Sequence, residues 1–192
     1  MKKIVLAIDI MGGDFGPKTT IEGVALASEA YPDVKFVLFG DKKKSENELK
    51  SIANLKNYEL IHTSESISST DQPVNALRKL KKSSMRLGIN SVKLNECDGL
   101  VSAGNTGALM AISKFVLKTI KAIDRPAIAA LMPTMKGQTV ILDLGANVEC
   151  SSENLVQFAI MGDMFSRSVL GIKNPKLGLL NVGSEQIKGN TV

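Results

Sequence analysis

Short apolar runs alternate along the chain with longer segments of helical periodicity, a pattern that predicts strands followed by helices. Residues 4–8 and 140–142 carry no polar side chain. Strands that are apolar on both faces are typical of a parallel sheet with helices on each side. The expected strands are residues 3–9, 34–40, 58–62, 99–103, 138–144 and 176–182, and the expected helices are residues 19–30, 45–54, 74–95, 106–121 and 153–170. The pattern therefore predicts an α/β fold with a mostly parallel sheet.

Proline and glycine mark several ends of these elements. Pro17 and Pro73 suit a first helical turn, where the missing backbone N–H costs nothing. Gly40 and Gly171 lie where a strand and a helix should stop. The serine pair at residues 83–84 leaves open whether residues 74–95 form one helix or two.

Length and composition limit the classes of protein that fit. The 192 residues are 44% hydrophobic, which is enough for a single α/β domain over residues 1–192. The longest stretch without a charge, residues 99–113, is shorter than the roughly 20 apolar residues that a spanning helix needs. Cys97 and Cys150 form no CxxC pair, so neither a disulfide framework nor a thiolate zinc site is expected, and a cytoplasmic location fits best.

The charge balance favours anionic partners. There are 24 Lys and Arg residues against 19 Asp and Glu, which gives a formal net charge of +5. Because only 4% of the residues are aromatic and none is tryptophan, there are few platforms on which bases could stack, and nucleic acid is not expected. Phosphate groups, an acidic protein or an anionic lipid surface are better candidates.

Four expected strands end in glycine-containing turns with small polar residues. These turns are residues 9–14, 102–107, 143–147 and 181–185. In an open parallel sheet the carboxyl ends of the strands meet at one edge, where backbone N–H groups and helix N-termini bind anions. Ordinary corners of α/β proteins need the same residue types, but four such turns together favour a binding site at this edge.

The motifs of nucleotide binding are missing from these turns. No Gly-Lys pair of a Walker A loop occurs, and no turn completes Gly-x-Gly-x-x-Gly. The only histidine, His62, has no Gly-x-Ser-x-Gly motif to serve, and packing or exposure is its expected role. Asp9 and Asp14 flank the first turn without a second set of metal ligands. We therefore expect bound phosphate, with neither a metal nor another cofactor.

A basic stripe is the other candidate for binding. Arg78, Lys82 and Arg86 recur at four-residue spacing on the helix expected over residues 74–95. A solvated helix face is the more common explanation of such a stripe. Lys188 differs, because it follows the last glycine turn and lies near the expected edge.

Taken together, the turns resemble a known family. The matching blocks are AIDIMGGDFGP at residues 7–17, LR through SSMR at residues 77–86, VSAGNTGALM at residues 101–110, DRPAIA at residues 124–129, LDLGANV at residues 142–148, QFAIMG at residues 157–162, GLLNVGSE at residues 178–185 and KGN at residues 188–190. In this order they resemble the bacterial phosphate acyltransferases, the PlsX family. One departure is Ile10, where the family usually has alanine; it should tighten packing under the first turn.

The resemblance implies transfer of a fatty acyl group from acyl-acyl-carrier-protein to inorganic phosphate, which gives acyl phosphate for phospholipid synthesis. It also implies a three-layer α/β fold similar to isocitrate and isopropylmalate dehydrogenases, a homodimer, and peripheral association with the inner face of the membrane. Family members are longer than this chain, so a C-terminal truncation is expected. No covalent residue is needed, because phosphate is its own nucleophile and the protein has only to position it and stabilise the oxyanion.

Roles for individual residues follow from the turns and the resemblance together. The residues expected in catalysis are Asn105, Asn147 and Lys188. The residues expected to bind substrate are Asp9, Gly12, Gly13, Thr106, Gly107, Asp143, Gly183, Ser184 and Glu185. Arg78, Lys82 and Arg86 are expected to bind the carrier protein. Two alternatives stay open: a non-catalytic module that docks carrier protein or membrane, and a phosphotransacetylase-like enzyme that uses acyl-coenzyme A.

Overall fold

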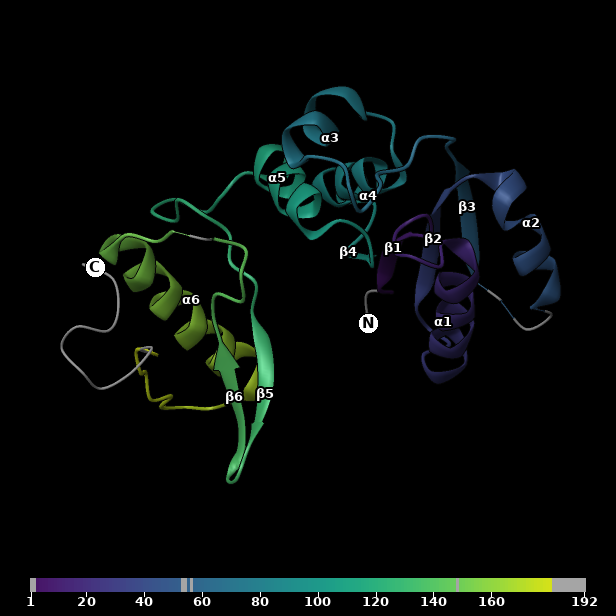
Figure 1. The fold of residues 1–192 in the computed structure, drawn as a ribbon. Helices are drawn as coiled ribbons and strands as arrows, with labels where there is room; N and C mark the ends of the chain where they lie inside the picture. The colour runs from purple at the N-terminus through teal and green to yellow at the C-terminus, as the bar shows by residue number, and fades with distance from the viewer. Residues whose placement is uncertain (1–2, 53–54, 56, 148, 181–192) are drawn as a thin grey trace. The chain divides into compact units, whose positions relative to one another are not determined.

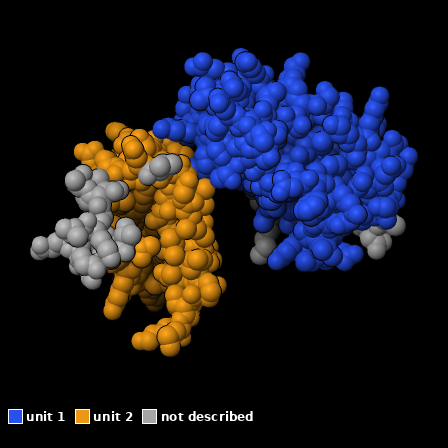
Figure 2. Space-filling view, in the orientation of Figure 1, with its two compact units in different colours: residues 1–118 blue, residues 119–192 orange. Residues whose placement is uncertain are grey.

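The computed structural model describes residues 3–52, 55, 57–147 and 149–180. The chain divides into two compact units, Met1–Lys118 and Thr119–Val192 (Figures 1 and 2). Each unit has its own helices and strands. The expectation of a single domain over residues 1–192 stays a prediction.

The first unit is built on a four-stranded parallel sheet. Its elements in chain order are β1 (Val5–Asp9), α1 (Pro17–Ala30), β2 (Lys35–Gly40), α2 (Lys42–Ser51), β3 (Tyr58–His62), α3 (Pro73–Lys79), α4 (Ser84–Lys93), β4 (Gly99–Ser102) and α5 (Thr106–Leu117). The strand order is β3-β2-β1-β4, and each neighbouring pair is parallel. Because β1 lies between β2 and β4, the turns that leave β1 and β4 emerge side by side.

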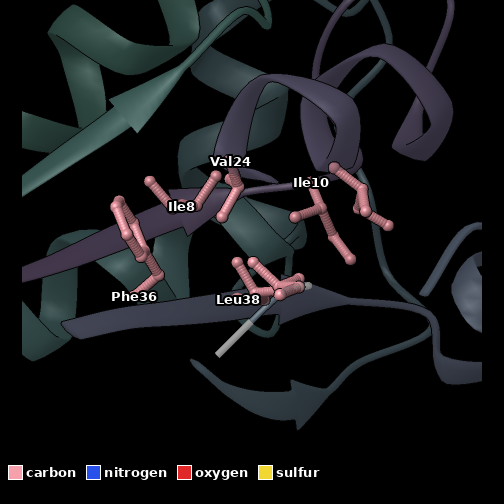
Figure 3. Packing of buried hydrophobic residues seen from close by; sticks show 7 residues of the cluster. Ile8, Ile10, Val24, Phe36 and Leu38 are labelled. Atoms are coloured by element: carbon pink, nitrogen blue, oxygen red, sulfur yellow. The ribbon is translucent and has the colours of Figure 1, made fainter. Parts of the chain in front are cut away.

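Alternate residues of the central strands face two different helical layers. Ile8 of β1 packs with Phe36 and Leu38 of β2 against Ile21 and Val24 of α1 (Figure 3). The residues between them face the opposite side, where Ala7, Val37 and Phe39 pack with Leu87 and Val92 of α4. Period-two alternation with both faces buried is the arrangement of a sheet between two layers of helices. The predicted α/β class with a mostly parallel, helix-covered sheet is confirmed.

A second apolar cluster joins the helices that follow β3. It contains Ala76, Met85, Ile89, Ala108, Ile112 and Val116 from α3, α4 and α5, together with Ile67 from the loop after β3. The loop is therefore anchored to the helical layer by a buried side chain. Ile10, the departure from the family pattern, is also fully buried, as its expected packing role requires.

The second unit contains an antiparallel hairpin and one long helix. Strands β5 (Ala130–Thr134) and β6 (Gly137–Ile141) pair with each other, and α6 (Ser152–Leu170) follows. Ser151 and Asn154 form a reciprocal capping box at the start of α6, and Gly171 ends it in the left-handed region at φ 67°. Gly162 faces Leu142, with 3.3 Å between its ideal Cβ position and Leu142 Cδ1, so its lack of a side chain lets the helix lie close to the end of β6.

Several predicted elements need correction. The helix expected to reach residue 121 ends at Leu117, whereas the stretch 74–95, left open between one helix and two, forms two. Strand β5 was not predicted, because its Pro133 weakens the strand pattern, and β6 belongs to the antiparallel hairpin instead of the parallel sheet. Residues 176–180 of the expected last strand are not extended in a sheet, and residues 181–182 lie outside the described part.

The ends marked by proline and glycine are confirmed. Pro17 and Pro73 begin α1 and α3, and Gly40 and Gly171 lie at the ends of β2 and α6. Within the described residues, no helix is both long and apolar enough to span a bilayer.

Candidate functional site

The buried carboxylate of Asp9 joins the turns that follow β1 and β4. Asp9 ends β1 directly opposite Ser102, which ends β4, and it is only 2% exposed. Its Oδ2 accepts a hydrogen bond from Ser102 Oγ at 2.7 Å, and its Oδ1 accepts one from the Met11 N–H at 3.2 Å. Ser102 Oγ in turn accepts one from the Gly104 N–H at 3.1 Å. One carboxylate thus fixes both turns through a short network.

Two glycines let the backbones of these turns touch. A Cβ atom on Gly12 would lie 2.7 Å from Gly104 N and 2.9 Å from Asp9 Oδ2, so no side chain fits there. Gly13 has φ +90°, a conformation that side chains disfavour. The first and second glycine turns of the sequence are therefore brought together, as predicted.

A cavity of about 570 Å³ opens beside this junction. Its walls are the turn at residues 11–16, the first turn of α1 at Thr19 and Thr20, the loop at residues 66–69 and the turn at residues 103–105. The lining combines four glycines and one alanine of the turns and several hydroxyl residues with the apolar side chains of Met11, Phe15 and Ile67, and Asp14 is its one ionisable residue among those described. Such a surface offers hydrogen-bond donors from several directions to one small polar ligand.

The start of α1 has no side-chain cap within the part of the chain that the structure describes. Pro17 occupies the first helical position, and Gly16 at the N-cap gives no side-chain hydrogen bond. The backbone N–H groups of a first helical turn have no partner within the helix, and they carry the positive end of its dipole. Together with the glycine turn beside it, this end of α1 has the features of an anion-binding helix terminus.

The start of α5 is arranged differently, because Asn105 caps it. Asn105 Oδ1 accepts a hydrogen bond from the Ala108 N–H at 2.9 Å. Its Nδ2 lies 3.2, 3.1 and 2.9 Å from the carbonyl oxygens of Ser68, Ser69 and Asp71. Thr106 and Gly107 follow as the first residues of α5; both are exposed and lie outside the cavity lining. Asn105 thus joins one cavity wall to another.

The third glycine turn lies in the second unit. Asp143 Oδ1 accepts a hydrogen bond from the Ile128 N–H at 2.8 Å, and Oδ2 accepts one from the Asn147 N–H at 2.7 Å. Asn147 Nδ2 also donates to Pro126 O at 3.0 Å. The expectation that all four turns share one sheet edge is wrong for this turn, because β6 pairs with β5 and not with the parallel sheet.

Four predicted site residues cannot be placed. Gly183, Ser184, Glu185 and Lys188 lie outside the described residues. Their expected roles stay predictions.

The basic stripe is not one helical face. Arg78 lies in α3, Lys82 in the turn that follows, and Arg86 in α4. The helix breaks because Ser83 caps α4 and because the loop residue Glu65 accepts a hydrogen bond from the Lys82 N–H at 3.0 Å. Arg78 and Lys82 are exposed.

Arg86 is half-buried, and its guanidinium carbon lies 5.6 Å from the centre of the Phe115 ring. Among the described residues its buried Nη1 has no hydrogen-bond partner. The role of Arg78, Lys82 and Arg86 in binding a partner remains to be tested.

Sequence reasoning missed the serine-rich cavity wall. Residues 66–69 read Ser-Ile-Ser-Ser, and the cluster of hydroxyl residues after a strand was the one signal available. Thr19 and Thr20 were likewise passed over as ordinary helix residues. His62, by contrast, has a local role: its Nδ1 accepts a hydrogen bond from the Lys42 N–H at 3.1 Å at the start of α2.

Comparison with known proteins agrees with the resemblance. A family model described as "Fatty acid synthesis protein" matches residues 4–192. A protein of Paramagnetospirillum magneticum named "Phosphate acyltransferase" is 51% identical over 188 residues, which cover 97% of this chain and 54% of that protein. One of the same name from Magnetococcus marinus is 50% identical over 186 residues, which cover 96% and 53%. The chain therefore spans about half the length of the curated relatives it matches.

Proposed function

Since this chain belongs to the fatty acid synthesis protein family, we propose that the whole protein is a phosphate acyltransferase. It moves a fatty acyl group from acyl-acyl-carrier-protein to inorganic phosphate and releases acyl phosphate for phospholipid synthesis. The cavity beside Asp9 and Gly12 carries this proposal, because it joins a glycine turn to the uncapped start of α1.

The reaction needs a bound phosphate and a stabilised oxyanion. A phosphate oxygen attacks the thioester carbonyl carbon, and the carbonyl oxygen becomes an oxyanion. When the tetrahedral intermediate collapses, the C–S bond breaks and the thiolate leaves with the electron pair to be protonated. Because the nucleophile comes from the substrate, the protein contributes position and hydrogen-bond donors and needs no acyl-enzyme.

We assign phosphate to the first turn of α1 and the turn at Gly12 and Gly13. Backbone N–H groups there are oriented in advance, which is the property that makes donors effective in catalysis. Asp9 acts by holding the turns together, since its oxygens accept hydrogen bonds from Ser102 and Met11. Thr106 and Gly107, at the start of α5 and outside the cavity lining, keep their expected role in binding substrate. Asp143, Asn147, Gly183, Ser184, Glu185 and Lys188 keep their expected roles in substrate binding and catalysis.

The carrier protein is the proposed partner of Arg78, Lys82 and Arg86. The exposure of Arg78 and Lys82 supports this assignment, because their charges are available to an acidic partner. We further propose that the protein is a homodimer in the cytoplasm and that it contacts the inner face of the membrane peripherally.

Charge reversal tests the docking surface. We expect Arg78→Glu with Lys82→Glu to raise KM for acyl-acyl-carrier-protein about tenfold at low salt, with little change in kcat, because exposed charges act mainly on encounter. Added salt should shrink the difference. Lys93→Glu, at the last position of α4, is the matched control and should change KM less. An unchanged KM in the double variant would show that Arg78 and Lys82 are ordinary solvated cations with no role in docking.

The activity itself is tested by incubating purified protein with acyl-acyl-carrier-protein and inorganic phosphate. Acyl phosphate should form and should depend on both substrates. A parallel reaction contains acyl-coenzyme A in place of acyl-acyl-carrier-protein. If acyl phosphate forms only in that reaction, the enzyme is phosphotransacetylase-like. If the carrier protein binds without turnover, the chain is a docking module.

A further inference from the structure

The side-chain amide of Asn105 has no hydrogen-bond donor left for a ligand. Its Oδ1 is occupied by the Ala108 N–H at 2.9 Å. Its two N–H groups face three carbonyl oxygens, those of Ser68, Ser69 and Asp71, all within 3.2 Å. An amide whose donors already have three acceptors cannot also donate to a substrate oxyanion without releasing the loop.

The loop that Asn105 holds is itself ordered by short contacts. The Ser68 N–H donates to Asp71 Oδ2 at 2.8 Å, and the Asp71 N–H donates back to Ser68 O at 3.1 Å. Ile67, between Ser66 and Ser68, is only 6% exposed and packs in the cluster of α3, α4 and α5. The loop thus has an apolar anchor on one side and the Asn105 amide on the other.

This loop forms the wall of the cavity that faces the turn of β1 and the start of α1. Ser66, Ser68 and Ser69 line that wall, and Asn105 lines the cavity beside them. The Asn105 amide, which lies more than thirty residues further along the chain, thus contacts the backbone of two of these three hydroxyl-bearing residues, Ser68 and Ser69.

We infer that Asn105 is a positioning residue, which fixes the Ser66–Ser69 wall of the cavity to the start of α5 and so sets the space available to the phosphate. The identity of that ligand rests on the proposed function. The attachment of the loop by the Asn105 amide, the clamp, is inferred only from the hydrogen bonds of Asn105. This role replaces direct donation to the oxyanion as the way in which Asn105 contributes to turnover.

Substitution can separate the cap from the clamp. Asn105→Ser keeps a good N-cap acceptor for α5, removes both amide donors and adds no charge. Asn105→Ala removes the cap as well. Asp41→Ala is the matched control, because Asp41 caps α2 through the N–H groups of Lys43 and Lys44 and has no hydrogen bond to the loop.

Amide hydrogen exchange of the intact chain is the first readout. In Asn105→Ser the amides of Ser68 and Asp71 should exchange about tenfold faster, while amides in the middle of α5 keep their protection. Asp41→Ala should leave the loop unchanged. Unchanged exchange of the loop in Asn105→Ser would overturn the clamp. No ligand is present in this experiment, so its result is independent of the proposed function.

Kinetics supply the second readout, which a merely structural residue would not give. With acyl-acyl-carrier-protein as donor, Asn105→Ser should raise KM for phosphate about tenfold and leave kcat within about threefold, because the wall contacts the phosphate before and during reaction. A loss of about 10² to 10³ in kcat with KM unchanged is the signature of a lost oxyanion donor and would contradict the positioning role. Absence of turnover in the unsubstituted protein would count against the proposed function and leave the exchange result standing.

Discussion

Gly12→Ala is expected to lower the free energy of unfolding by about 3 kcal/mol, at the upper end of what overpacking costs. The added Cβ would lie 2.7 Å from Gly104 N and 3.0 Å from Gly104 Cα. These neighbours are backbone atoms, which cannot rotate away as a flexible side chain would. The turns after β1 and β4 must therefore separate, and the cavity between them changes shape.

A glycine in the same unit provides the control. Gly23 lies within α1, and a Cβ atom there would meet nothing within 4 Å. Gly23→Ala should raise stability by about 0.5–1 kcal/mol, since alanine favours the helix. Urea unfolding followed by circular dichroism suits a chain without tryptophan. If Gly12→Ala unfolds at the same urea concentration as the unsubstituted chain, the close approach of the two turns is wrong.

Asp9→Ala should cost about 2–4 kcal/mol of stability. The substitution leaves the part-buried Ser102 hydroxyl and Met11 N–H without their acceptor, and each orphaned group costs about 1–3 kcal/mol. Asp14→Ala is the matched control, because Asp14 belongs to the same turn but is exposed, and its removal should stay within about 0.5 kcal/mol. Equal unfolding midpoints for the two variants would show that Asp9 does not hold the turns together.

The sequence predicted those features that depend on local pattern. Apolar runs identified β1 to β4, and Pro17 and Pro73 marked where α1 and α3 begin. Because β1 and β4 are neighbours in a parallel sheet, the meeting of their glycine turns could also be expected from the sequence. This was the part of the site that sequence reasoning placed correctly.

The remaining features depend on contacts between distant residues. The break before α4, which the serine pair at residues 83–84 left open, is fixed by the Ser83 cap together with Glu65, a residue distant in sequence that accepts a hydrogen bond from the Lys82 N–H. The cavity wall at residues 66–69 is held by Asn105, whose sequence context indicates only a helix cap. Strand β5 contains Pro133, which weakens its strand pattern, and its extended conformation is supported by antiparallel pairing with β6. Periodicity cannot report such partners, because each segment is locally consistent with a loop or a longer helix.

Phosphate binding by the cavity at the ends of β1 and β4 can be measured by titrating inorganic phosphate into the isotope-labelled chain while amide chemical shifts are recorded, with chloride at equal ionic strength as the reference. We expect saturable shifts at the amides of Gly13, Thr19, Thr20 and Ser69, which all line the cavity. Shifts confined to exposed cations such as Arg78 and Lys82, or no saturable shift at the cavity amides, would contradict phosphate binding by the cavity.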